Sequence, residues 1–129
     1  MLNDNVKLWV EALRSGKYTQ GMGLLRSRND EYCCLGVACE LYAERHPELA
    51  VVVPGEDSDY YTYGGRSDVL PHAVAVWLGL KSAVGGYRQT TDDDSALTED
   101  NDNGTTFAEI ADIIEREPDG LFGETEEDY

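Results

Sequence analysis

Two segments of the chain repeat apolar residues with the spacing of an amphipathic helix, and this spacing constrains the fold most. Residues 5–14 place apolar side chains at i, i+3, i+4 and i+7, and residues 106–116 repeat the pattern. Such a helix carries one apolar stripe that must be buried against other elements. Thr106 and Glu109 add a capping-box pattern, which predicts where the second helix starts.

Two further helices are expected between these segments. YCCLGVACELYAERH predicts a helix from about Cys33 to Arg45, which Pro47 ends. Gly36 lies inside it and costs roughly 1 kcal/mol unless another backbone packs closely there. Pro71 opens the other helix at its favoured first-turn position, and Gly79 closes it.

Short strands complete the expected fold. Strands are predicted in the β-branched run 49–53, in residues 60–66 and in residues 87–91, while the stretch 92–104 is predicted to be an acidic loop. A chain of 129 residues suits one hydrophobic core. We therefore predict an α+β fold: a single small domain of about four helices packed with a few short strands, dominated by helix. Residues 1–118 form the predicted globular domain, and residues 119–129 form an acidic C-terminal tail.

The charge is unevenly placed along the chain. There are 26 acidic and 10 basic residues, a net charge of −16, and residues 92–129 hold fifteen acidic residues against the single basic Arg116. Such a field repels nucleic acid and anionic membranes and attracts basic partners. Direct binding of DNA or RNA phosphates is therefore not expected across the C-terminal third. Solubility, or a proteome that is acidic throughout, explains the same charge without a partner.

All three cysteines fall within the helix predicted around YCCLGVACELY. Cys33 and Cys34 would point about 100° apart on it, so they would not readily face one zinc ion. No C-x-x-C redox pair occurs, and Glu40 would oppose the thiolate that a nucleophile needs. A buried core is the favoured interpretation, with Cys34 facing inward and Cys33 left open. Their odd number also argues against a disulfide framework and favours a reducing cytoplasm.

The sequence contains no pattern typical of an enzyme, a metal site or a membrane span. Asp100, Asp102 and Gly104 suggest a calcium loop, but Ile110 stands where the bidentate Glu belongs. The phosphate-loop, nucleophile-elbow and zinc-protease patterns are missing, so we expect no catalytic residue, no metal and no cofactor. No apolar run is long enough for a membrane span, and the first residues do not form a secretion signal.

Four segments, in order, resemble a set of small, mostly uncharacterised accessory proteins of tailed phages and prophages. The segments are WVEALRSGKYTQGMGLLRS, YCCLGVACELY, LPHAVAVWLGL and DNDNGTTFAEIADIIE. The acidic insert around Asp92–Asp94 and the acidic tail depart from that family's pattern. The resemblance implies a phage accessory protein that acts in the host cytoplasm, and it brings no catalytic residue.

Two surfaces are candidates for function. The first is an acidic face that binds a host or defence protein, itself basic or nucleic-acid-binding, by imitating backbone phosphates. Its predicted residues are Asp92, Asp93, Asp94, Glu99, Asp100, Asp102, Glu109, Asp112 and Glu115. The alternative is a small pocket for a nucleotide or other anionic ligand, since arginine beside tyrosine suits phosphate recognition. Its predicted residues are Arg26, Arg28, Arg66 and Arg88, unless these pair with the abundant carboxylates.

Overall fold

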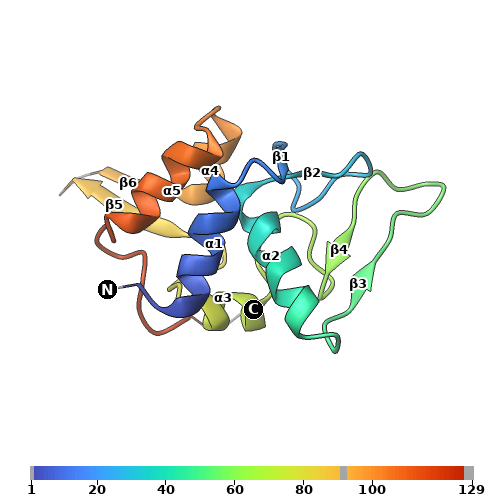
Figure 1. Ribbon diagram of the computed structural model, residues 1–129, viewed down its shortest axis with the longest axis horizontal. Helices are drawn as coiled ribbons and strands as arrows, with labels where there is room; N and C mark the ends of the chain where they lie inside the picture. The colour runs from blue at the N-terminus through green and yellow to red at the C-terminus, as the bar shows by residue number, and fades with distance from the viewer. Residues whose placement is uncertain (1, 91–92, 127–129) are drawn as a thin grey trace.

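Five helices surround a common core in the part of the chain that the computed structural model describes, residues 2–90 and 93–126 (Figure 1). The helices are α1 (Asp4–Arg14), α2 (Cys34–Arg45), α3 (His72–Leu78), α4 (Leu97–Asp102) and α5 (Phe107–Glu115). The strands are β1 (Thr19–Gln20), β2 (Glu31–Tyr32), β3 (Val51–Val52), β4 (Thr62–Tyr63), β5 (Gly86–Thr90) and β6 (Asp93–Ala96). They form three two-stranded sheets, of which β1–β2 is parallel and β3–β4 and β5–β6 are antiparallel. The predicted helix-dominated α+β class is confirmed.

The first and last helices lie side by side at the centre of the molecule (Figure 1). Both bury the predicted apolar stripe, on α1 from Val6 to Leu13 and on α5 from Phe107 to Ile114. Asn3 caps α1 by accepting the Val6 amide at 2.8 Å. The capping box of Thr106 and Glu109 is present at the start of α5 and confirms its predicted beginning.

The first half of helix α2 is buried all round rather than on one face. Every residue from Cys34 to Cys39 is buried, because other elements surround its first two turns. A Cβ at Gly36 would lie 1.6 Å from the Leu25 carbonyl oxygen, so the predicted close backbone contact is confirmed. Glycine lets the loop backbone lie directly against the helix.

Helix α3 starts one residue later than its sequence suggests. Pro71 is the N-cap instead of the first helical residue, and Gly79 ends the helix in the left-handed conformation, with φ of 76°. The side-chain amides of Asn3 and Asn5 donate to the Leu78 and Trp77 carbonyls, at 3.2 and 2.9 Å. The end of α3 is thereby fastened to the start of α1.

The prediction of an acidic loop is wrong for residues 93–102, which form β6 and α4. Ala96 and Leu97 are buried in this stretch, and Ala96 lies opposite Gly86 in the β5–β6 hairpin. The many acidic residues around Ala96 and Leu97 favoured a loop in the sequence prediction, but burial of these two apolar side chains holds the segment against the core. Tertiary packing thus overrides the low strand propensity of aspartate.

Residues 119–126 lie along the segment 79–88. The Arg88 amide donates to the Asp119 carbonyl at 2.7 Å, and the Lys81 amide donates to the Leu121 carbonyl at 3.0 Å. Leu121 is fully buried, and Phe122 forms a bridge with Leu80. This part of the acidic C-terminal segment therefore contributes to the core.

Candidate functional site

Two hydrogen-bonded side-chain amides, the buried Asn101 and the partly buried Gln20, join three of the four sequence segments that resemble phage accessory proteins. Asn101 is fully buried, and its Oδ1 accepts from the Cys34 amide at 3.1 Å and from Gln20 Nε2 at 2.8 Å. Its Nδ2 donates to the Gly21 carbonyl at 2.7 Å. Gln20 Oε1 in turn accepts the Phe107 amide at 3.1 Å. Because these groups already have partners inside the protein, this pair stabilises the fold.

The cysteines are core residues. Cys33, Cys34 and Cys39 are free thiols with at most 1% of their surface exposed. Burial raises the pKa of Cys33 to about 11 and raises the pKa of Cys34 and Cys39 well above the ordinary value. The favoured core interpretation is confirmed for Cys34, and it extends to Cys33, which the sequence left open.

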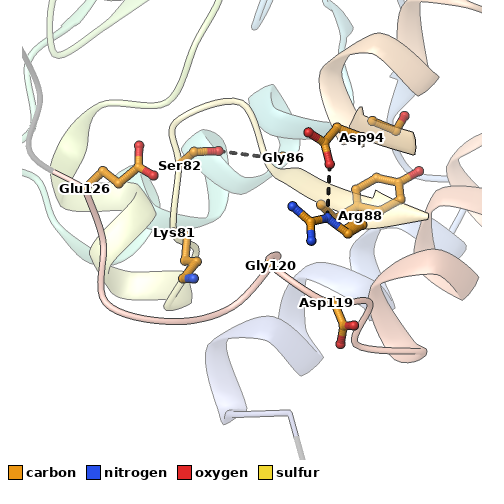
Figure 2. A pocket seen from close by; sticks show the side chains of 10 residues that line it. Lys81, Ser82, Gly86, Arg88, Asp94, Asp119, Gly120 and Glu126 are labelled. Carbon is orange, nitrogen blue, oxygen red and sulfur yellow. Dashed lines mark hydrogen bonds and ion pairs between the residues drawn. The ribbon is translucent and has the colours of Figure 1, made fainter. Parts of the chain in front are cut away.

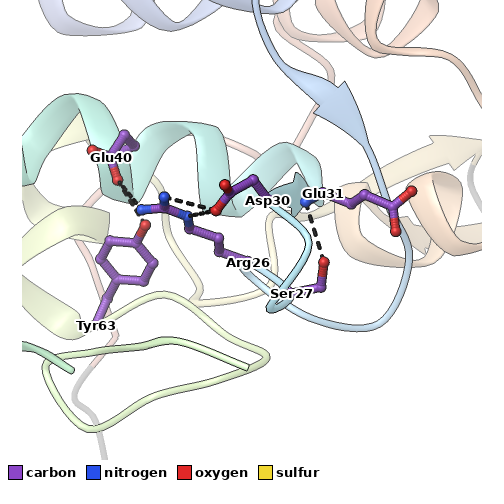
Figure 3. A network of polar contacts seen from close by, with 6 residues as sticks. All are labelled: Arg26, Ser27, Asp30, Glu31, Glu40 and Tyr63. Atoms are coloured by element: carbon purple, nitrogen blue, oxygen red, sulfur yellow. Dashed lines mark hydrogen bonds and ion pairs between the residues drawn. The ribbon is translucent and has the colours of Figure 1, made fainter. Parts of the chain in front are cut away.

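Arg26 is the centre of a polar network between the loop before β2, helix α2 and strand β4 (Figure 3). Its Nε donates to Asp30 at 2.9 Å, and Nη1 contacts Glu40 at 3.4 Å. Glu40 also accepts the Tyr63 hydroxyl at 2.7 Å, and the guanidinium stacks 3.8 Å from the Tyr61 ring centroid. Burial opposes its charge, but hydrogen bonds to Tyr63 and Asp30 raise the pKa of Arg26. Only 19% of its side chain is exposed, so Arg26 has a structural role in holding these three segments together.

The other three arginines do not complete a common pocket with it. Arg28 donates to the carbonyls of Gly55 and Ser58 and holds the loop after β3. Arg66 follows β4 and forms a backbone bridge with Tyr63. Arg88 lies on β5, at the opposite end of the molecule from β4 (Figure 1). The predicted arginine set is therefore divided between two ends of the fold.

Arg88 lines an open polar pocket of about 560 Å³ (Figure 2). The lining residues are Lys81, Ser82, Gly86, Tyr87, Arg88, Asp94, Ser95, Asp119, Gly120 and Glu126. Arg88 Nε lies 3.3 Å from Asp94, and Ser82 Oγ accepts the Gly86 amide at 2.9 Å. Two cations and three carboxylates line this pocket, and Arg88 Nε already pairs with one of those carboxylates, Asp94.

The described residues of the predicted acidic face, which leave out Asp92, occur on β6, α4 and α5, in one half of the molecule (Figure 1). Asp112 and Glu115 both pair with Arg14 of α1, yet 63% and 46% of their side chains stay exposed. Asp94 pairs with Arg88 and is 79% exposed. These three charges therefore face solvent from regular elements even though each has a partner.

Four other residues of that face have different surroundings. Hydrogen bonds that Glu109 accepts from Thr106 lower the pKa of its carboxyl group. The bond from the Thr106 backbone amide has the larger effect, and the bond from its hydroxyl has the smaller one. Asp100 accepts the hydroxyls of Tyr87 and Ser95, and Asp102 accepts the Gly23 amide at 2.8 Å. Glu99 is exposed on α4. The capping-box pattern predicted the hydrogen bonds of Glu109, whereas those of Asp100 and Asp102 are not revealed by charge counting along the sequence.

Two members of the predicted set are not placed in the same detail. Asp92 lies outside the described residues, and Asp93 begins β6.

Within the described residues, no group of three or more His, Cys, Asp or Glu side chains could hold a metal ion. None of the described helices has the length and apolar character needed to span a membrane.

One protein family matches almost the whole chain. The family model described as "Domain of unknown function (DUF8296)" matches residues 2–118, which reach from the residue before the Asn3 cap to the proline after α5. No curated protein and no solved structure matches the chain significantly.

Proposed function

The chain belongs to the DUF8296 family, and we propose that it is a non-enzymatic phage accessory protein that binds a basic host or defence protein in the host cytoplasm. Binding would use the carboxylates exposed on β6, α4 and α5. A partner that normally binds nucleic acid fits this surface, because spaced carboxylates present negative charge as backbone phosphates do.

One observation carries the proposal: exposed carboxylates of an acidic segment are held on regular elements. Residues 92–129 sum to −14, and Asp112 and Glu115 on α5 keep about half or more of their side chains exposed. Arg14 is the one cation that pairs with both of them among the described residues. Charges fixed on a helix attract a basic partner without an ordering cost, which favours fast association.

The phage context is supported by the resemblance of the four sequence segments. Parts of those segments have a purely structural role: Asn101 and Gln20 form internal hydrogen bonds, and Gly36 allows a close backbone contact. The proposed surface combines Asp112 and Glu115, which lie within the fourth of these segments, with the acidic insert around Asp92–Asp94, which departs from the shared pattern.

The proposal is tested by capture from a bacterial host lysate at about 50 and 500 mM salt, a range over which surface electrostatics weaken strongly. The immobilised chain should retain a defined basic protein at low salt. The triple variant Glu99→Gln, Asp112→Asn, Glu115→Gln should lose most of it.

A matched control removes three exposed carboxylates elsewhere: Glu31→Gln, Glu44→Gln, Asp68→Asn. This variant has the same net charge as the first and should still retain the partner. Equal loss in both triple variants, or retention that salt does not change, would argue against an acidic docking face.

A second candidate function is binding of a small anion in the Arg88 pocket. The pocket volume of about 560 Å³ and the adjoining Ser82, Lys81 and Tyr87 favour it. A thermal-shift screen with nucleotides and inorganic phosphate tests it, since a ligand that binds only the folded state raises Tm. The shift should vanish in Arg88→Ala and persist in Arg28→Ala; no shift with any of these probes would count against the pocket.

A further inference from the structure

A short strand with exposed apolar residues lies at one end of the molecule. Val51, Val52 and Val53 have relative exposures of 38%, 57% and 66%. Tyr60, which lies just before β4, is 39% exposed. Of the six large hydrophobic residues exposed in the described part of the chain, four lie in this one place. The ribbon β3–β4 and its connecting loop project from the helices at the end opposite β5 and β6 (Figure 1).

One edge of this ribbon has no strand beside it among the described residues. The sheet contains only β3 and β4, with Val51 opposite Tyr63 and Val52 opposite Thr62. The Gly64 amide donates to the Ala50 carbonyl at 2.7 Å, so Ala50 and Gly64 form a hydrogen-bonded pair. Because such pairs alternate in antiparallel ladders, Val51 and Val53 direct their amide and carbonyl groups to the open edge.

Open strand edges pair readily with other extended chains. Proteins usually protect them with charge, proline or a covering element, and here Pro54 and the short length of β3 limit the edge. The three valines still offer apolar contacts on both faces. An added strand would gain main-chain hydrogen bonds from the edge and specificity from alternate side chains.

The surrounding charge indicates which chain would fit. Residues 47–65 contain four acidic residues, Glu48, Glu56, Asp57 and Asp59, and no lysine or arginine. All four are exposed. Three arginines neighbour this segment. Arg45 lies just before it and pairs with Glu44, Arg28 holds the Ser58 carbonyl, and Arg66 lies just beyond β4. An apolar edge framed by carboxylates complements an extended segment that alternates apolar residues with lysine or arginine.

We propose that the β3 edge is the docking site for such a basic, extended segment of the partner protein. The inference rests on the proposed function, since it adds a second contact for the same basic partner. A second copy of the chain fits poorly, because each copy carries −16 and would bring the same four carboxylates to the contact.

The test uses a displayed library of random octapeptides selected on the full chain, followed by fluorescence anisotropy with the enriched peptides. Enriched sequences should alternate β-branched residues with Lys or Arg. Their affinity should fall at least tenfold for Val52→Lys, Val53→Lys, which places positive charge on the edge. Val76→Lys, at a 53% exposed valine on α3, is the control and should bind normally. A central proline should abolish binding, because it removes an amide from the added strand.

Several outcomes would overturn the inference. Enriched peptides that bind the Val52→Lys, Val53→Lys variant normally would do so, as would failure to enrich any peptide. Loss of a concentration-dependent dimer in that variant, seen by ultracentrifugation, would assign the edge to a second copy instead. In the lysate experiment, partner capture that is lost only in the Glu99, Asp112, Glu115 triple variant would keep the proposed function and reject this docking site. Capture that is lost only in the Val52→Lys, Val53→Lys variant would keep the β3 docking site and reject the acidic face on β6, α4 and α5.

Discussion

Gly36 lies where helix α2 crosses the backbone that leads into β2. A methyl group there would fall 1.6 Å from the Leu25 carbonyl oxygen, which is backbone and has little freedom to move. Gly36→Ala should therefore lower the free energy of unfolding by about 3 kcal/mol, although alanine favours helix by about 1 kcal/mol. Urea denaturation measures the change.

The control for Gly36 is Gly55→Ala, because no atom lies within 4 Å of a Cβ at that position. Its free energy of unfolding should stay within about 0.5 kcal/mol of the parent value. If Gly36→Ala were as stable as the parent, α2 and the loop backbone would not be in the contact described.

The cysteines allow a second test at single residues. Burial and the raised pKa of Cys33, Cys34 and Cys39 should make all three unreactive towards a thiol reagent at pH 8 in the folded protein. In urea, all three should react. Rapid labelling of even one thiol in the native state would contradict the packing of α2.

At the scale of elements, the start of α5 links stability to pH. Hydrogen bonds from Thr106 lower the pKa of Glu109, so its stabilising effect is present above the unfolded-state pKa and is lost as pH falls through the folded-state value. Glu109→Ala should therefore have a lower Tm than the parent at pH 7, and the difference should shrink towards pH 3. Thermal unfolding followed by circular dichroism measures both values.

Two comparison variants separate capping from charge. Thr106→Ala removes the same cap from the other side and should cost about 1 kcal/mol at pH 7. Glu99→Ala removes an exposed carboxylate from α4 and leaves the cap of α5 in place. A Tm difference for Glu109→Ala that stayed constant from pH 7 to pH 3 would rule out the capping explanation.

Elements with a periodic apolar pattern could be predicted from the sequence, whereas elements defined by distant partners could not. The stripes of α1 and α5 and the capping box were predictable because their determinants lie within one helix. The strand β6 depends on pairing with β5, and α4 depends on the burial of Leu97. The split of the arginines likewise follows from the contacts of Arg26 with Glu40 and of Arg88 with Asp94, which no local spacing encodes.

For the whole molecule, charge is the dominant long-range term. A net charge of −16 repels itself most strongly in the compact state, and salt screens this repulsion. Tm should therefore rise when NaCl is raised from about 10 to 300 mM, a range over which the Debye length falls from about 30 Å to below 10 Å. KCl should act like NaCl, and a fall in Tm with either salt would show that ion pairs such as Arg14 with Asp112 outweigh the repulsion.

The packing of α1 on α5 also sets an order of events during synthesis. Arg14 and its partner Asp112 are 98 residues apart, so α1 leaves the ribosome long before the helix against which it packs exists. Domains generally fold as units while the chain is made, but this one cannot close until its last helix emerges. A ribosome stalled before residue 107 would carry a nascent chain whose first helix still exposes part of its apolar stripe. Chaperones that recognise apolar segments would find it then, and release of the finished chain would remove their binding site.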